Sequence, residues 1–265
     1  MATPTSNSQP KINKISLHPN DVILDKYRII EVIGHGGMNS DIYKAEDISN
    51  TTDEWFNSNG KFVAIKMVNR SSETTDGDWM KIHDECVTAK RASGCQNIVK
   101  TYDISEINNG NTVIIVMEYV NGVSLNNYLS KVGNINVKEA LFIFEKILDA
   151  VKELHGFQHK IIHRDLKPEN IMLTNDMTKV KLIDFGISSV LTTSKTTGDK
   201  TALTDESTVF GSFPYMCPET LDLANSRLTK EQKSKIISEQ FDFFSLGVIL
   251  YEMLVGQKPF SFEKE

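Results

Sequence analysis

Four polar residues in the second half of the chain have the types and spacing that a divalent cation and a polyphosphate require. Asp165, Lys167 and Asn170 lie in the segment HRDLKPEN, and Asp184 lies shortly after in LIDFG. Carboxylate and amide oxygens are ligands that Mg²⁺ prefers, and an ammonium group neutralises charge on a phosphate. No cysteine or histidine cluster in the sequence has the spacing of a zinc site. We therefore expect a hard cation here.

A run of glycines near the start of the chain suggests a phosphate-binding turn. Gly34, Gly36 and Gly37 surround His35 between two strand-like segments. Glycine has no Cβ and adopts positive φ freely, so such a run lets the backbone approach a phosphate closely. The pattern is not a P-loop, which needs Gly-Lys-Ser/Thr, nor a dinucleotide-binding turn, which leads into a helix. By itself it fits an ordinary hairpin turn equally well.

Lys66 lies on a strand-like segment, KFVAIKMV, whose neighbouring residues are mostly apolar. A buried ammonium group is costly unless an anionic group meets it. The helical segment 79–92 offers Glu85 on its apolar face, so the two side chains can form an ion pair. The alternative is two unrelated side chains that extend to solvent.

These residues need elements that bring them together, and the sequence predicts two different halves. Alternating apolar residues and turn signals predict strands, and a period of 3.6 predicts helices. Strands are expected at residues 27–34, 41–47, 61–68, 98–107, 111–119, 171–173 and 180–184, and helices at 79–92, 137–154 and 240–255. A strand-rich lobe is thus joined near residues 118–122 to a helix-rich lobe. The polar first 26 residues predict a flexible tail.

The composition excludes several classes of protein. The chain has 265 residues, a net charge of −6 and 40% hydrophobic residues, which suits one large or two-lobed globular domain. The acidic balance, without a Lys/Arg-rich block, argues against nucleic acid or an anionic membrane surface as a partner. The start lacks the apolar core of a secretory signal, no apolar run could span a bilayer, and the cysteines lack a disulfide pattern. We therefore expect a cytoplasmic location, with no nucleic acid and no membrane segment.

Taken in order, the motifs resemble those of the protein kinases. The corresponding segments are the glycine-rich loop at 34–36, VAIK at 63–66, the catalytic loop HRDLKPEN at 163–170, DFG at 184–186, and CPE at 217–219 where APE is expected. The resemblance implies a two-lobed α+β fold. It implies an antiparallel sheet in a small ATP-binding lobe, residues 27–119, and a mainly helical large catalytic lobe, residues 120–265.

The resemblance also implies the cofactors ATP and Mg²⁺ and a role for each polar residue of the large lobe. Asp165 would accept the proton of the substrate hydroxyl, and Lys167 would neutralise the γ-phosphate. Asn170 and Asp184 would hold Mg²⁺. Asp242, near the start of the last predicted helix, would hold the backbone of the catalytic loop.

In the small lobe, the resemblance implies that Lys66, held by Glu85, binds the α- and β-phosphates. Met117 would be the gatekeeper, and residues 118–120 the hinge whose backbone binds adenine. The nucleotide-binding residues implied in this way are Ile33, Gly34, His35, Gly36, Gly37, Ile42, Ala64, Lys66, Met117, Glu118 and Val120.

The subtype follows from the same resemblance. Lys167, two residues after Asp165, and Ser212 in GSFPYMCPE resemble the Ser/Thr kinases, and GGM at 36–38 is similar to the eukaryotic-like Ser/Thr kinases of bacteria. The implied substrates are Ser/Thr hydroxyls of proteins. Many Ser and Thr residues at 188–208 suggest autophosphorylation of an activation loop, with possible self-association, although a merely disordered polar segment has the same composition.

Three features depart from the kinase pattern, of which one is a long polar loop at residues 47–60 between two predicted strands. Met38, Asn39 and Ser40 stand where the third glycine of the loop is expected. The chain ends just after the last predicted helix, so we expect a large lobe that is incomplete at its C-terminus, with Glu219 lacking its usual arginine and apolar side chains exposed on that helix. A longer parent chain could carry a membrane anchor. A non-catalytic kinase-like module that binds nucleotide or acts as a scaffold is the alternative function, and a metabolite phosphotransferase is a third.

Overall fold

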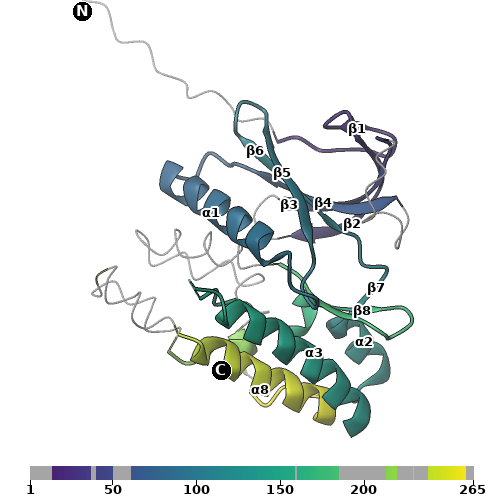
Figure 1. The fold of residues 1–265 in the computed structure, drawn as a ribbon, viewed down its shortest axis with the longest axis vertical. Helices are drawn as coiled ribbons and strands as arrows, with labels where there is room; N and C mark the ends of the chain where they lie inside the picture. Colours follow the sequence, from purple (N-terminus) through teal and green to yellow (C-terminus); the bar gives the residue numbers. More distant parts are fainter. Residues whose placement is uncertain are drawn as a thin grey trace, which may run out of the picture.

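The structure is a computed structural model, and it describes residues 14–36, 40–49, 61–158, 160–184, 213–219, 229 and 238–260. Its strands are β1 (Val22–Ile23), β2 (Tyr27–Gly36), β3 (Ser40–Asp47), β4 (Phe62–Asn69), β5 (Thr101–Ile107), β6 (Thr112–Glu118), β7 (Gly122–Ser124), β8 (Ile171–Thr174) and β9 (Val180–Leu182). Its α-helices are α1 (Asp76–Ala92), α2 (Leu125–Val132), α3 (Val137–His155) and α8 (Gln240–Val255), and its 3₁₀ turns are η2 (Pro168–Asn170) and η4 (Phe213–Tyr215). A sheet-rich small lobe stands above a helical large lobe (Figure 1).

The small lobe is an antiparallel sheet of six strands in the order β1-β2-β3-β4-β6-β5. Successive side chains of a strand point to opposite faces, so β4 contributes to two cores. Val63, Ile65 and Met67 pack in the core on the outer face, which is the face away from α1. Val68 packs against Trp79 in the core that α1 covers. Alternation therefore places Lys66 on the face toward α1.

The start of the described chain differs from the sequence prediction. Residues 14–26 belong to the range predicted as a flexible tail, yet they line the outer face of the sheet. Ile15 and Leu17 pack against the outer core, and Ile23 of β1 pairs with Tyr27 of β2. The few apolar residues of this segment find their partners in distant strands, and so no local pattern in the sequence reveals them.

The large lobe contains α2, α3, α8 and a small sheet. α3 packs against α8, and the antiparallel sheet β7-β8-β9 lies between these helices and the small lobe (Figure 1). Both α2 and α3 begin at a side-chain cap, because Ser124 accepts from the backbone of Asn127 and Asn136 accepts from that of Glu139. β7 and α2 lie outside the elements that the sequence predicts.

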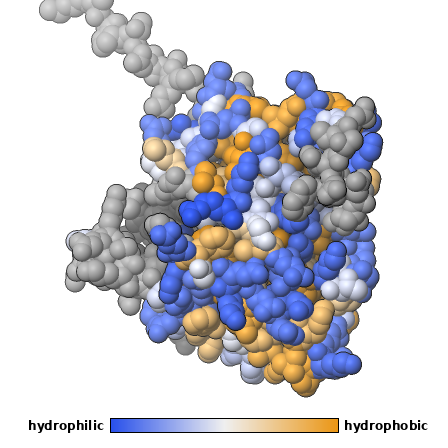
Figure 2. All heavy atoms as spheres, viewed as in Figure 1, coloured by the Kyte–Doolittle hydropathy of each residue, from blue (hydrophilic) through white to orange (hydrophobic). Residues whose placement is uncertain are grey.

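The apolar period from Val137 to Leu154 predicts a helix, and α3 confirms it. Only some of the apolar residues that define this period are buried. Val151 and Leu154 are buried, whereas Val137 and Leu141 are exposed. On α8, the expectation of exposed apolar side chains is confirmed, since Phe243, Tyr251 and Val255 are exposed. Figure 2 shows apolar side chains at the lower end of the large lobe, where α3 and α8 lie.

The two lobes are connected by backbone pairing as well as by the chain between β6 and β7. Leu182 of β9 donates its N–H to the carbonyl of Asn97 (2.8 Å), and its own carbonyl accepts from Val99 (2.9 Å). This pairing fixes the strand that precedes Asp184 against the segment that follows α1. A strand of the large lobe and a segment that the sequence assigns to the small lobe therefore meet at β9.

The architecture is an α+β, two-lobed fold, as the sequence predicts. Within the described ranges, no helix is both long and apolar enough to cross a membrane.

Candidate active site

The structure brings together the three polar residues of the catalytic loop. Lys167 Nζ lies 2.9 Å from Oδ2 of Asp165. Asn170 Nδ2 donates to the carbonyl of Asp165 (2.8 Å) and to its Oδ2 (3.0 Å). These contacts orient the Asp165 carboxylate from two sides. Because Nδ2 of Asn170 makes both bonds, Oδ1 of this amide is the atom that would bind a cation.

A buried carboxylate on α8 holds the backbone of this loop. Asp242 is fully buried, and it accepts from the backbone N–H groups of His163 and Arg164, both at 2.9 Å. A third bond comes from Nε2 of His155, at 2.8 Å. Arg164 has a φ of 64°, which is costly for a residue with a Cβ, so its bond to Asp242 offsets a strained conformation. The predicted role of Asp242 is confirmed.

His163 connects this anchor to the backbone of Asp165. Its side chain is buried, and burial lowers the pKa of the imidazole, although nearby Asp242 and Asp165 oppose this shift. A neutral imidazole has one nitrogen that accepts. Nδ1 of His163 accepts from the backbone N–H of Asp165 at 3.3 Å.

Asp184 meets Lys66 across the two lobes. Lys66 Nζ lies 2.6 Å from Oδ1 of Asp184, and the lysine side chain is only 8% exposed. Burial would raise the pKa of the Asp184 carboxyl, but its attraction to Lys66 outweighs burial and lowers it. Asp184 has a φ of 63°, and the preceding Ile183 donates its N–H to the Asn170 carbonyl (2.9 Å). This bond keeps Asp184 next to the catalytic loop.

The predicted partner of Lys66 was Glu85. Glu85 lies in α1, which covers the same face of the sheet, but its side chain is outside the described residues. The Lys66–Glu85 pair therefore stays a prediction. Lys66 has Asp184 as a described partner instead.

The apolar residues predicted to bind the nucleotide share one face of the sheet. Ile42 pairs with Lys66, and Ala64 pairs with Met117, so strand alternation places all four on the face toward α1. Ile42 also lies 3.6 Å from the position that a Cβ on Gly34 would take. This face carries the ammonium group of Lys66 at the edge of an apolar surface, as a phosphate-bearing aromatic ligand requires.

The glycine-rich hairpin is only partly described. Ile33, Gly34, His35 and Gly36 lie on β2, and Ile33 is exposed. The side chain of His35 bonds to Asp41 of β3. Gly37 lies outside the described residues, as do Phe185, Gly186, Ser212 and the Ser/Thr-rich residues 188–208.

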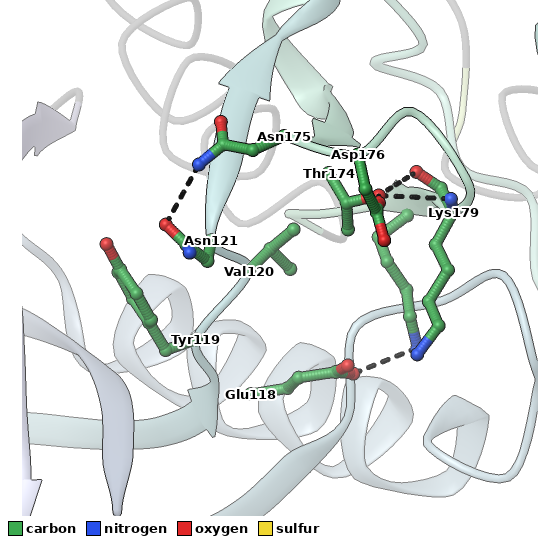
Figure 3. Close-up of a pocket in the computed structure, with 9 residues that line it drawn as sticks. Glu118, Tyr119, Val120, Asn121, Thr174, Asn175, Asp176 and Lys179 are labelled. Atoms are coloured by element: carbon green, nitrogen blue, oxygen red, sulfur yellow. Dashed lines mark hydrogen bonds and ion pairs between the residues drawn. The ribbon is translucent and has the colours of Figure 1, made fainter. Parts of the chain in front are cut away.

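The hinge residues lie beside a pocket that does not contain the catalytic groups. This pocket has a volume of about 270 Å³ and is lined by Glu118, Tyr119, Val120, Asn121, Thr174, Asn175, Asp176, Lys179 and Lys181. Figure 3 shows that several of its polar groups bond to one another, such as Asn121 with Asn175. Lys181 Nζ lies 2.9 Å from Oε2 of Glu118, and both side chains are nearly buried. The side chain of Glu118 is therefore engaged by the large lobe, so the predicted contact of this residue with adenine would come from its backbone.

The donor set fits Mg²⁺ bound together with phosphate oxygens. The described residues contain no group of three or more His, Cys, Asp or Glu residues that could hold a metal ion alone. Mg²⁺ is usually bound by one or two carboxylates, waters and substrate phosphates. Asp184 and Oδ1 of Asn170 would supply such a partial set, and Lys66 would face the phosphates.

The segment CPE at 217–219 packs on α8 through the neighbouring Tyr215. Tyr215 is buried, its hydroxyl donates to Glu252, and its carbonyl accepts from Ser245 Oγ at 2.7 Å. Glu219 is exposed, and its carboxylate accepts from the thiol of Cys217.

Comparison with known proteins agrees with this geometry. Residues 27–265 match the protein kinase domain family. A Mycoplasma pneumoniae protein named "Putative serine/threonine-protein kinase" is 40% identical over 93% of this chain and 66% of its own length. A Mycoplasma genitalium protein of the same name is 39% identical over 91% of this chain and 64% of its own length. The serine/threonine-protein kinase PrkC of Bacillus subtilis is 33% identical over 91% of this chain and 32% of its own length.

The chain therefore belongs to the protein kinase family. The relatives reported above carry the names of bacterial serine/threonine-protein kinases, which agrees with the eukaryotic-like bacterial kinases that the motifs resemble. The chain spans about two thirds of the length of the Mycoplasma relatives and about a third of PrkC.

Two residues of the site were missed in the sequence. Lys181 lies between Val180 and Leu182 on a short apolar strand, which is the same signal that identified Lys66. His155, the third partner of Asp242, follows the last buried residue of α3 and gives no local signal. Only the packing of α8 against α3 brings it to Asp242.

Proposed function

We propose that this chain is the catalytic part of an ATP- and Mg²⁺-dependent protein serine/threonine kinase, which transfers the γ-phosphate of ATP to Ser/Thr hydroxyls of proteins. One observation carries the proposal. The Lys66–Asp184 ion pair joins the nucleotide-facing side of the small-lobe sheet to the cluster of Asp165, Lys167 and Asn170. A phosphate donor, a cation and an acceptor hydroxyl would meet at this junction.

The chemistry assigned to the chain is positioning and charge stabilisation. Bound Mg²⁺ would offset the phosphate charge, and ATP would supply the phosphoryl group. The carboxylate of Asp165, oriented by Asn170, would take the proton of the acceptor hydroxyl at one of its oxygens. Lys167, which is mostly buried beside Asp165, would offset the charge that develops on the transferred group.

The preference for Ser/Thr is supported by the position of Lys167 and by the names of the relatives. Further parts of the proposal rest on the sequence and on family membership, without a described contact. They are the Lys66–Glu85 pair, autophosphorylation within residues 188–208, self-association, protein substrates and a cytoplasmic location. The division of the chain at residues 119 and 120 is proposed on the same ground.

The test is the intact mass of the purified chain before and after incubation with ATP and Mg²⁺. We expect mass steps of one phosphate in the wild type and none in an Asp184→Asn variant, because Asp184 would hold the cation. Asp149→Asn, an exposed carboxylate of α3, is the matched control and should behave like the wild type.

Mass steps that persist in Asp184→Asn would remove Asp184 from the mechanism. A folded wild type that binds ATP but shows no steps on itself or on a basic protein substrate would favour the alternative of a nucleotide-binding module. Consumption of ATP by small hydroxyl compounds alone would favour a metabolite phosphotransferase.

A further inference from the structure

A short segment before β1 is docked on the outer face of the small lobe. We call residues 14–18 the N-terminal strap. The side-chain amide of Asn69 bonds twice to the backbone of Ile15, once to its N–H and once to its carbonyl, both at 3.2 Å. The N–H of Leu17 donates to the hydroxyl of Tyr43 at 3.3 Å. Asn69 and Tyr43 are both buried, so the strap is held by fixed groups of β4 and β3.

The strap reaches the glycine-rich hairpin through one carboxylate. Lys14 Nζ lies 3.1 Å from Oδ2 of Asp41, and Nδ1 of His35 donates to Oδ1 of the same side chain at 2.9 Å. The Asp41 side chain is 12% exposed, whereas that of His35 is 78% exposed. Asp41 is thus a nearly buried bridge between the strap and an exposed side chain on β2.

The bridge acts at the end of the pairing between β2 and β3. His35 pairs with Asp41, and Gly34 pairs with Ile42 in the next position. Ile42 faces Lys66, so alternation places Asp41 and His35 on the opposite, outer face. The strap therefore contacts the hairpin from behind and leaves the nucleotide-facing side open.

Asp41 is ionised at neutral pH. Burial would raise the pKa of its carboxyl, but the hydrogen bonds from His35 and Lys14 outweigh burial and lower it. The ion pair with Lys14 is therefore formed under the conditions of an enzyme assay.

We propose that Lys14 and Asp41 are positioning residues for ATP, which hold the glycine-rich hairpin in its nucleotide-binding position from the outer face. This inference rests on the proposed function, because it assumes that Gly34 and Gly36 contact phosphate. Glycines have large conformational freedom, so a hairpin that contains them loses much entropy when it orders around a ligand. A bridge that fixes His35 beforehand reduces that loss and tightens binding.

The chain offers a matched control at the other end of the same strand. Lys26 Nζ lies 3.7 Å from Oδ2 of Asp47, the last residue of β3. This pair also joins a lysine that precedes β2 to an aspartate of β3, but it lies far from the hairpin along the strand. A general loss of packing in the small lobe would affect both pairs, whereas a positioning role would affect only the first.

The test measures the dissociation constant of ATP by titration calorimetry, and KM for ATP in the kinase assay, for wild type, Lys14→Ala, Lys14→Arg, Asp41→Asn and Lys26→Ala. For Lys14→Ala we expect both constants to rise roughly two- to fivefold, the range of a partly exposed ion pair, with kcat and KM for the protein substrate unchanged. Asp41→Asn should change ATP affinity in the same direction. Lys14→Arg should restore the wild-type values, and Lys26→Ala should retain them.

An ATP affinity of Lys14→Ala equal to that of the wild type would overturn the proposal, and so would equal losses in Lys14→Ala and Lys26→Ala. Failure of the proposed function has a different signature. If ATP binds but no phosphate is transferred, the kinase assignment fails, whereas the dissociation constants of the variants still decide the role of the strap.

Discussion

The catalytic loop and the glycine-rich hairpin both present backbone to the candidate active site, but they are held in different ways. The loop is bound by Asp242, which is fully buried and accepts three hydrogen bonds. The hairpin is bound by Asp41, which is itself nearly buried, but its two partners, Lys14 and His35, are 46% and 78% exposed. One carboxylate thus has buried partners, and the other has partners that reach solvent.

The difference has energetic consequences. A buried carboxylate that loses a partner, or buried N–H groups that lose their carboxylate, cost several kcal/mol, whereas exposed ion pairs contribute roughly 0–1 kcal/mol. The groups proposed to carry out the chemistry are therefore on a rigid support. The hairpin proposed to contact the nucleotide has a weaker support. The following predictions test this contrast.

The largest effect is expected at the catalytic carboxylate. Asp165→Asn keeps the shape of the side chain but removes the proton acceptor and the charge that pairs with Lys167, so the transfer rate should fall about 10²–10⁴-fold. The measurement is kcat with a protein substrate, alongside the dissociation constant of ATP, which should change little. Undiminished transfer in this variant would exclude Asp165 as the base.

The anchor of the loop should have the next largest effect, this time on stability. Asp242→Ala leaves the backbone N–H groups of His163 and Arg164 without their acceptor, and a group left unsatisfied costs about 1–3 kcal/mol. The free energy of unfolding in urea should therefore fall by about 2–6 kcal/mol. Asp149→Ala, an exposed carboxylate on α3, is the control and should change stability by less than about 0.5 kcal/mol. A similar small change in Asp242→Ala would contradict the rigid support.

The sequence predicted the parts of the site that lie within single segments. Asp165, Lys167 and Asn170 are close in the chain, so their types already indicated a phosphate and cation site. Lys66 was found because an ammonium group on an apolar strand needs a partner. The type and position of α1, α3 and α8 followed from their apolar period.

The remaining contacts depend on packing between distant segments and could not be predicted. The partner of Lys66 that the structure describes is Asp184, from the other lobe. His155 meets Asp242 only because α3 packs on α8, and the strap finds its place through buried side chains of β3 and β4. The apolar period of α3 indicated a helix, but which of its apolar residues are buried depends on where α8 lies.

A third prediction concerns the ion pair that joins the lobes at the hinge. Lys181 and Glu118 are only 8% and 12% exposed, so they belong with the buried supports. Lys181→Met or Glu118→Gln alone leaves one charge without its partner, and the double variant removes both charges. A double-mutant cycle of unfolding free energies should give a coupling of about 0.5–3 kcal/mol. Strictly additive losses would place this pair with the weak surface pairs instead.

The smallest expected effect is on the pH dependence of stability, and it comes from a buried group of the loop support. Burial lowers the pKa of His163 below its ordinary value of 6.5, so the unfolded chain takes up a proton that the folded loop resists. The stability from this group is present above about pH 6.5 and is lost as pH falls from there toward the lowered pKa. Asp242 also has a lowered pKa, but its contribution is lost only at more acidic pH, below its ordinary value of 3.8.

Urea unfolding at pH 7.5 and pH 5.5 should therefore show a smaller loss of stability in His163→Gln than in the wild type. His18→Gln, at an exposed residue of the strap, is the matched control and should lose as much as the wild type. If all three proteins lose the same stability, the imidazole of His163 titrates alike in the folded and unfolded chains. Asp242 would then be the remaining buried group of the loop support.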